Sequence, residues 1–197
     1  RIESKGRAAH TSTLKGTNAN LKMIPFLGEM VKINKLVLSS KRYRNEEFNP
    51  PSSEWCIGIN DHNPAMNVYP VQSVCQLAYR LMPGVDAAPL IERTENCAEK
   101  NGLRCRVVKQ HKPLYTPPDS PLVHTALKLT GTRKPKTVPY GTDGVAYSTK
   151  MKRLIVLGPG SISQAHTVDE WIEVKQLHKA VDIYSRFIDH FCVNTGA

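Results

Sequence analysis

The sequence predicts a mixed α/β and α+β protein in two parts, residues 1–112 and 113–197. In the first part, strand-like and helix-like apolar spacing alternate in the order βαββαβ, which is typical of an antiparallel sheet with two helices on one face. After Pro117-Pro118 the pattern changes, and a long amphipathic helix closes the chain. The second part has few strands of its own, so we expect it to be the C-terminal portion of an α/β domain.

The first part opens with a predicted strand in residues 2–12. Asn18 is placed to cap the helix that follows, and Pro25 within that helix predicts a kink or a later start. The apolar residues expected on the buried face of this helix are Leu21, Ile24, Leu27, Met30 and Val31.

Three further strands and a second helix complete the predicted sheet. The strands are residues 54–59, 67–81 and 104–111, and the helix is residues 86–100. A turn at residues 60–64 separates the first two strands, and Asn101-Gly102 ends the helix.

The second part is predicted to hold a helix in residues 120–130, ended by Gly131, and short strands at residues 137–138 and 154–157. Thr167 and Glu170 have the spacing of a capping box at the start of the last helix. One face of that helix is expected to pack against a sheet through Trp171, Val174, Leu177, Val181, Tyr184, Ile188 and Phe191.

The chain has 197 residues, a net charge of +10 and five cysteines. Because the cysteine number is odd and no Cys-x-x-Cys pair occurs, we expect reduced thiols in a cytoplasmic protein. No apolar run approaches the length of a membrane span and no secretory signal is recognisable, so no membrane association is expected. The chain opens at Arg1 without an initiator methionine, and we expect it to be part of something longer or processed.

The positive charge favours attraction of anions, and its densest cluster is residues 41–44. We do not expect nucleic acid to be the partner, since no basic block is interleaved with aromatic residues and no zinc finger or RNA-binding sheet motif occurs. If the chain did bind nucleic acid, its affinity for DNA or RNA would fall steeply with added salt.

The most informative segment is residues 154–170. A β-branched apolar run stops at Gly158-Pro-Gly160, and a short polar stretch then presents His166 just before the capping box. A histidine between a buried strand and a helix start is well placed to reach a cleft at the C-terminal edge of a sheet.

Six ordered segments together resemble the acetylornithine deacetylase branch of the M20 family of di-zinc amidohydrolases. They are Gly6-x-x-x-His10-Thr-Ser12, Gly16-Thr-Asn18-Ala19, Asn67-Val-Tyr-Pro70, Arg80-Leu-Met-Pro-Gly84, Gly141-Thr142-Asp143 and Gly158-Pro-Gly-Ser-Ile-Ser-Gln-Ala-His166. The resemblance covers nearly the whole chain but only part of the family's length. It implies that residues 1–112 are an inserted lid used for homodimerisation and that residues 113–197 are the return of the catalytic domain.

The resemblance implies metal-assisted hydrolysis of a small N-acyl amino acid, with two zinc ions in the complete enzyme and cobalt as a possible substitute. His166 matches a zinc ligand. The family's other ligands and its general base lie in a preceding half, which this chain does not contain. Since one histidine cannot hold the metal tightly, we expect the chain to be inactive alone.

The resemblance also gives roles to five other residues. His10 is expected to stabilise the oxyanion in the partner's active site, and Arg80 to grip the substrate's α-carboxylate. Asn67, Gly141 and Thr142 are expected to contact the substrate. From the residues alone, simpler roles stay open: His10 could bond the turn after it, Arg80 could pair with a surface carboxylate, and Asn67 could merely turn the chain.

One departure from the family is the stretch of residues 60–67, which lacks the usual Gly-Gly pair and puts the identity of the substrate in doubt. An alternative function is a stand-alone dimerising or binding module that has lost catalysis.

Overall fold

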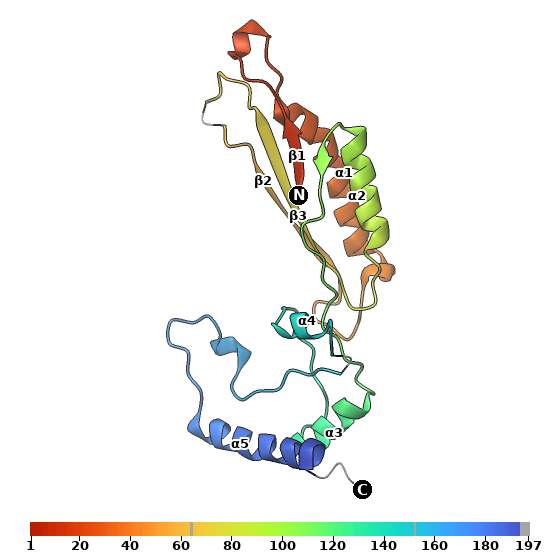
Figure 1. The fold of residues 1–197 in the computed structure, drawn as a ribbon, viewed down its shortest axis with the longest axis vertical. Coiled ribbons are helices and arrows are strands. Elements are labelled where there is room, and N and C mark those ends of the chain that lie inside the picture. The colour runs from red at the N-terminus through yellow and green to blue at the C-terminus, as the bar shows by residue number, and fades with distance from the viewer. Residues whose placement is uncertain (64, 152, 194–197) are drawn as a thin grey trace. The chain divides into compact units, whose positions relative to one another are not determined.

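The computed structural model describes residues 1–63, 65–151 and 153–193 (Figure 1). Pro64, which belongs to the predicted turn at residues 60–64, lies outside the described residues. The chain forms two units, Arg1–Pro113 and Leu114–Ala197.

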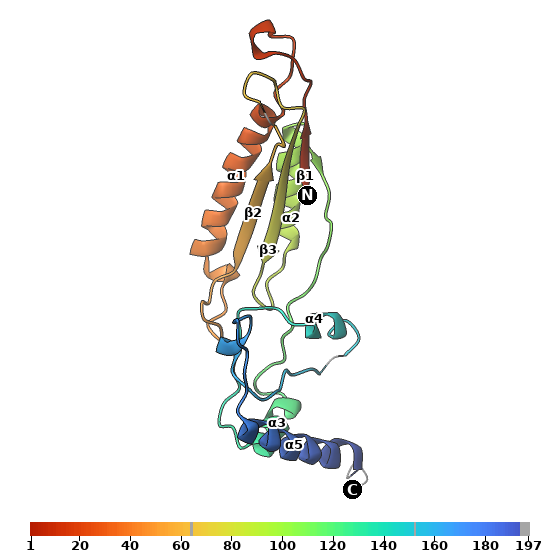
Figure 2. The same ribbon diagram turned by 90° about the vertical axis from the view of Figure 1, so that its left-hand side faces the viewer.

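The first unit is a four-stranded antiparallel sheet with two helices, as predicted. Its elements are β1 (Ile2–Lys5), α1 (Ala19–Ser39), β2 (Glu54–Asn60), β3 (Gln72–Arg80), α2 (Ala88–Lys100) and β4 (Arg104–Cys105). The strands lie in the order β2-β3-β1-β4, which leaves β2 and β4 at the two edges. Figures 1 and 2 show α1 and α2 on the same face of this sheet.

The core of this unit fills the space between the sheet and the two helices. It includes Ile2, Met23, Phe26, Met30, Ile33, Trp55, Cys75 and Leu90, all buried. The Trp55 and Tyr79 rings stack at 5.6 Å, and the Tyr79 hydroxyl lies 2.7 Å from Thr94 Oγ1 on α2. Burial raises the pKa of the Cys75 thiol to about 11, so this cysteine packs as an apolar group.

The predicted buried face of α1 is largely wrong. Asn18 caps the helix as expected, and the helix runs through Pro25. The residues that face the sheet, however, are Ala19, Met23, Phe26, Met30, Ile33 and Val37. Leu21 and Ile24 are 65% and 57% exposed. The predicted and the observed residues both recur at helical spacing. The face that packs on the sheet is the one that carries Phe26, the largest fully buried side chain.

Three of the four strands are shorter than predicted. β1 ends at Lys5, although the Gly6 N–H still donates to the Val71 carbonyl, and the next residue, Arg7, bridges to Thr17 instead. β3 begins only after Pro70, which has no N–H to donate. β4 pairs with β1 over two residues, Arg104 and Cys105, and the Arg106 N–H donates to the Arg1 carbonyl.

The second unit contains α3 (Pro121–Thr130), α4 (Gly144–Tyr147) and α5 (Val174–Ile188), followed by a single π turn, Asp189–Val193. As predicted, α3 ends at Gly131, which adopts a left-handed conformation with φ of 71°. α3 packs on α5, and among the described residues of this unit the buried apolar ones are Val123 and Ala126 on α3 and Ala180 on α5.

Two strands predicted in the second unit, residues 137–138 and 154–157, do not form. No strand occurs among the described residues of this unit, so neither segment has a neighbour with which to form a ladder. For the same reason the predicted packing of α5 against a sheet is wrong. Its apolar stripe is largely open, and Leu177 and Val181 are 51% and 59% exposed.

Within the residues that the structure describes, no helix combines the length and the apolar character needed to cross a membrane.

Candidate functional site

The loop that carries His10 is tied to the segment that carries Asn67. The Thr11 N–H donates to the Asn67 carbonyl at 2.8 Å, and the Tyr69 N–H donates to the Ala9 carbonyl at 3.1 Å. His10 and Val68 form an antiparallel bridge. Two residues 57 positions apart in sequence are thus held at the same end of the sheet, beyond the first residue of β3.

Two glycines let the chain pass closely at this end. A Cβ on Gly6 would lie 2.5 Å from the Pro70 carbonyl oxygen, and a Cβ on Gly16 would overlap the Tyr69 ring. The Tyr69 hydroxyl in turn donates to the Thr11 carbonyl at 3.3 Å. Gly6 and Gly16 are therefore required by the close approach of the backbone.

The His10 side chain is exposed and bonds only within its own turn. Its Nδ1 lies 2.7 Å from Ser12 Oγ and accepts from the Ser12 N–H at 3.3 Å. Among the described residues, none bonds the imidazole Nε2. That nitrogen is open to a ligand, as the predicted role in stabilising an oxyanion requires. The role itself stays a prediction.

The segment before Asn67 is ordered by side chains that the sequence had not singled out. The Asn20 amide donates to Asp61 Oδ2 at 2.7 Å, and this bond, followed by one from the Asn63 N–H, holds the pKa of Asp61 below its usual range. The Asn63 amide donates to the carbonyls of Ala65 and Val68. The density of Asn and Asp in residues 60–67 was the available signal for such a turn.

His62 adopts a backbone conformation that glycine favours. Its φ is 51°, in the left-handed region that glycine adopts most easily, and its N–H bonds Asn60 Oδ1. The turn therefore forms without glycine, with Asn60 and Asn63 bonding on either side of His62.

Arg80 lies at the opposite end of the sheet from His10 and Asn67. It is the last residue of β3, and Gln72 at the other end of β3 is separated from it by roughly 26 Å, at about 3.3 Å per residue. Figure 1 shows the turn after β1, in red, beyond one end of the sheet and the end of β3 at the other. Arg80 is exposed, and no carboxylate of the described residues forms an ion pair with it.

His166 is exposed in a loop of the second unit. Its φ is 62°, and its N–H donates to Glu170 Oε1 at 2.6 Å. The predicted capping box is therefore wrong: Glu170 bonds the His166 backbone, and the residue that precedes α5 is Glu173, three positions later. Thr167 Oγ1 donates to the Gln164 carbonyl instead.

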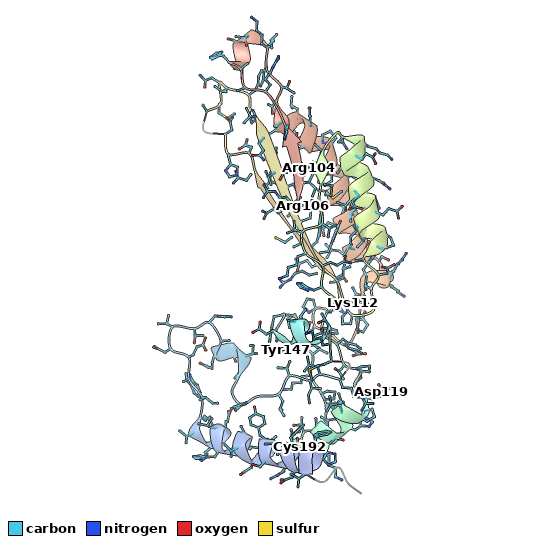
Figure 3. The ribbon with its side chains drawn as sticks, in the orientation of Figure 1. Arg104, Arg106, Lys112, Asp119, Tyr147 and Cys192 are labelled. Atoms are coloured by element: carbon cyan, nitrogen blue, oxygen red, sulfur yellow. The ribbon has the colours of Figure 1, made fainter. Side chains whose placement is uncertain are left out.

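Gly141 and Thr142 precede the short helix α4. Thr142 Oγ1 accepts from the Gly144 N–H at 3.2 Å, and a Cβ added to Gly141 would meet nothing within 4 Å. A Cβ on Gly144, the first residue of α4, would lie 2.8 Å from the Leu114 side chain, which would have to move to admit it. Figure 3 labels Tyr147, the last residue of α4.

The described residues contain no group of three His, Cys, Asp or Glu side chains that could hold a metal ion. His166 would therefore supply one ligand at most. The residues present do not make a metal centre by themselves, since structural and catalytic zinc sites use three or four protein ligands.

The basic residues at the β4 edge contact one another and a carboxylate. The Arg1 Nε donates to Glu3 Oε1 at 2.6 Å, and this bond is the main cause that lowers the pKa of Glu3 below its usual range, with Arg104 and Arg106 adding to it. Figure 3 labels Arg104, the first residue of the edge strand β4, and Arg106, which follows that strand. The Glu3 carboxylate thus offsets part of the positive charge of these arginines within the first unit.

Comparison with known proteins agrees with the segments described above. Residues 10–190 match Peptidase family M20/M25/M40. An acetylornithine deacetylase of Photorhabdus laumondii subsp. laumondii is 29% identical over 99% of the chain and 52% of its own length. Those of Klebsiella pneumoniae and Pectobacterium carotovorum are each 30% identical, over 97% of the chain and 51% of their own length.

The chain spans about half the length of these relatives. The match to the family, in contrast, covers most of the chain, including the His10 loop, β3 and the His166 loop. The chain belongs to peptidase family M20/M25/M40.

Proposed function

We propose that this chain is part of a metal-dependent amidohydrolase that removes the acyl group from an N-acyl amino acid. Residues 1–112 act as a lid and dimerisation domain, and residues 113–197 act as the closing portion of the catalytic domain. Similarity to acetylornithine deacetylases supports the substrate class. The five free cysteines are consistent with a reducing, cytoplasmic location.

One observation carries the proposal: His10 and Asn67 lie at one end of the first unit, and Arg80 lies at the other. A small substrate cannot bridge roughly 26 Å, so one lid cannot bring all three residues to the same molecule. A homodimer resolves this, because a two-fold axis brings the His10 end of one copy to the site served by Arg80 of the other.

The dimer contact that we propose uses the open side of β2 and the outer face of α1. β2 is an edge strand with unpaired backbone groups, and Ile57 and Ile59 on it are exposed. Leu21, Ile24 and Val31 form an exposed apolar stripe on α1. An edge strand without lysine, proline or a bulge favours pairing with another chain.

In the assembled site, each residue has one proposed task. His10 donates a hydrogen bond to the carbonyl oxygen as that oxygen gains negative charge, and Arg80 binds the α-carboxylate through its guanidinium. Asn67 and the loop of Gly141 and Thr142 line the substrate. His166 is one zinc ligand, and the remaining ligands come from outside this chain.

Mixed dimers of the complete protein test this arrangement. His10→Ala and Arg80→Ala each abolish activity alone. Mixed in equal amounts and allowed to exchange, they give heterodimers in about half of the molecules, each with one intact site, so about a quarter of the wild-type activity returns.

The matched control mixes His10→Ala with Asn67→Ala. Both residues lie at the same end of the lid, so neither site in the heterodimer receives an intact pair and no activity returns. Recovery in this control, or none in the first mixture, would contradict the shared site.

A second function, a dimerising module without catalysis, is favoured by the first unit alone. That unit has its own core, built from both helices and the sheet. This second function predicts that the 197-residue chain forms a stable dimer in light scattering. It also predicts that joining the chain to a complementary catalytic half does not restore hydrolysis.

A further inference from the structure

Ser12 contacts the His10 imidazole through two different groups. Its backbone N–H donates to His10 Nδ1 at 3.3 Å, and its hydroxyl oxygen lies 2.7 Å from the same nitrogen. Both contacts fall on one ring nitrogen and leave Nε2 without a partner among the described residues.

These contacts decide which ring nitrogen carries the proton. A backbone N–H can only donate, so Nδ1 must present its lone pair to Ser12. The Ser12 hydroxyl then donates its hydrogen to that lone pair as well, because an N–H at Nδ1 would point at the backbone N–H. In neutral imidazole the proton is therefore on Nε2.

We infer that Ser12 is a positioning residue that holds His10 in the Nε2–H tautomer, with its single donor directed away from the turn. The effect on catalysis follows only if His10 is the oxyanion donor proposed above. An oxyanion needs a hydrogen-bond donor, and the other tautomer would turn a lone pair toward it.

The turn itself does not depend on the Ser12 side chain. Thr13 Oγ1 donates to the His10 carbonyl at 2.8 Å, and the Thr11 N–H and carbonyl bond Asn67 and Tyr69. Removal of the Ser12 hydroxyl therefore tests the tautomer rather than the fold of the loop.

The test is nitrogen-15 NMR of the histidine rings in the 197-residue chain, at a pH of about 8.5 where histidines are ordinarily neutral. The His10 signals are identified by their loss in His10→Gln. We expect the wild type to be mainly Nε2–H. Ser12→Ala removes one neutral hydrogen bond and should raise the ratio of Nδ1–H to Nε2–H roughly fivefold.

Two variants separate positioning from a structural effect. Ser12→Thr keeps a hydroxyl and should restore the wild-type ratio. Thr13→Ala removes a loop hydrogen bond that does not touch the ring, and it should leave the ratio unchanged. A wild-type ring that is mainly Nδ1–H, or a ratio that Ser12→Ala leaves unaltered, would overturn the inference.

Kinetics of the complete enzyme supply an independent arm. Ser12→Ala should lower kcat in proportion to the loss of the Nε2–H fraction, by less than about threefold when the wild-type ring is mainly Nε2–H, with little change in KM, since the bond to the oxyanion forms in the transition state. Ser12→Thr should recover it. If His10→Ala keeps full activity, the proposed function of His10 fails while the tautomer measurement still stands. If Ser12→Ala shifts the tautomer but not kcat, the positioning role fails.

Discussion

The backbone N–H of Thr11 donates a 2.8 Å hydrogen bond to the carbonyl oxygen of Asn67. This bond joins the turn after β1 to the segment before β3 and needs neither side chain. Alanine variants of His10 and Asn67 should therefore leave this end of the sheet folded. Loss of activity in the mixed-dimer experiment can then be assigned to the side chains.

Gly6→Ala should destabilise the chain. The new Cβ would lie 2.5 Å from the Pro70 carbonyl oxygen, and the crowding atoms are backbone atoms that cannot rotate away. We expect the free energy of unfolding, measured by urea denaturation, to fall by about 2 kcal/mol or more.

Gly28→Ala is the matched control for this substitution. Gly28 lies inside α1, and a Cβ added to it would meet nothing within 4 Å, so the same change relieves the entropic disadvantage of glycine in a helix. A gain of about 0.5–1 kcal/mol is expected. Equal losses at both positions would show that the steric explanation for Gly6 is wrong.

The ion pair between α1 and α2 should make the stability of the first unit depend on pH. Arg93 Nε donates to Glu29 Oε1 at 3.0 Å, and this contact, with a second from Lys32, holds the pKa of Glu29 below its ordinary value of 4.5. A carboxylate whose folded pKa is lowered stabilises the fold above its unfolded pKa, and this contribution disappears as pH falls through the folded pKa.

Glu29→Gln should therefore be less stable than the wild type at neutral pH, and the two curves should converge below a pH of about 4.5. Both side chains are partly exposed, so added salt should shrink the difference. Glu92→Gln, on α2 but without an ion pair among the described residues, is the control and should follow the wild type. Curves for Glu29→Gln that run parallel to the wild type at every pH would exclude the ion pair as the cause.

The order of elements in the first unit could be predicted because each one carries a local signal. Asn18 caps α1, Asn101-Gly102 ends α2, and both features appear as expected. The buried face of α1 could not be predicted, since Ile24 and Met23 belong to two different apolar stripes that have the same helical spacing. Only packing against the sheet selects between them.

Strand lengths and contacts within the site depend on neighbours distant in sequence. β4 forms only where it pairs with β1, and residues 154–157 have no neighbouring strand among those described. The motif around His10 was visible in the sequence, whereas the bonds that join it to Asn67 follow from the tertiary structure. Asp61 and Asn63 were missed because an isolated turn gives no sign of what it positions.

Val181→Ser should reduce self-association of the chain with little effect on its stability. Val181 is 59% exposed on the open stripe of α5, so its replacement removes apolar surface from contact with water without leaving a cavity. We expect the free energy of unfolding to change by less than about 0.5 kcal/mol, while light scattering shows weaker association. Ala180→Asp is the control: Ala180 is buried where α5 meets α3, and a charge there should unfold the second unit.

The 197-residue chain alone should not hold zinc tightly. His166 is exposed, and no second or third ligand lies with it among the described residues, so binding would rest on one imidazole. After dialysis against a weak chelator, elemental analysis should find far less than one zinc per chain, and His166→Ala should not change that value. In the complete protein, the same substitution should remove bound zinc and hydrolysis together. One zinc per isolated chain, lost in His166→Ala, would mean that this chain assembles its own metal centre, and the proposed division of the ligands would be wrong.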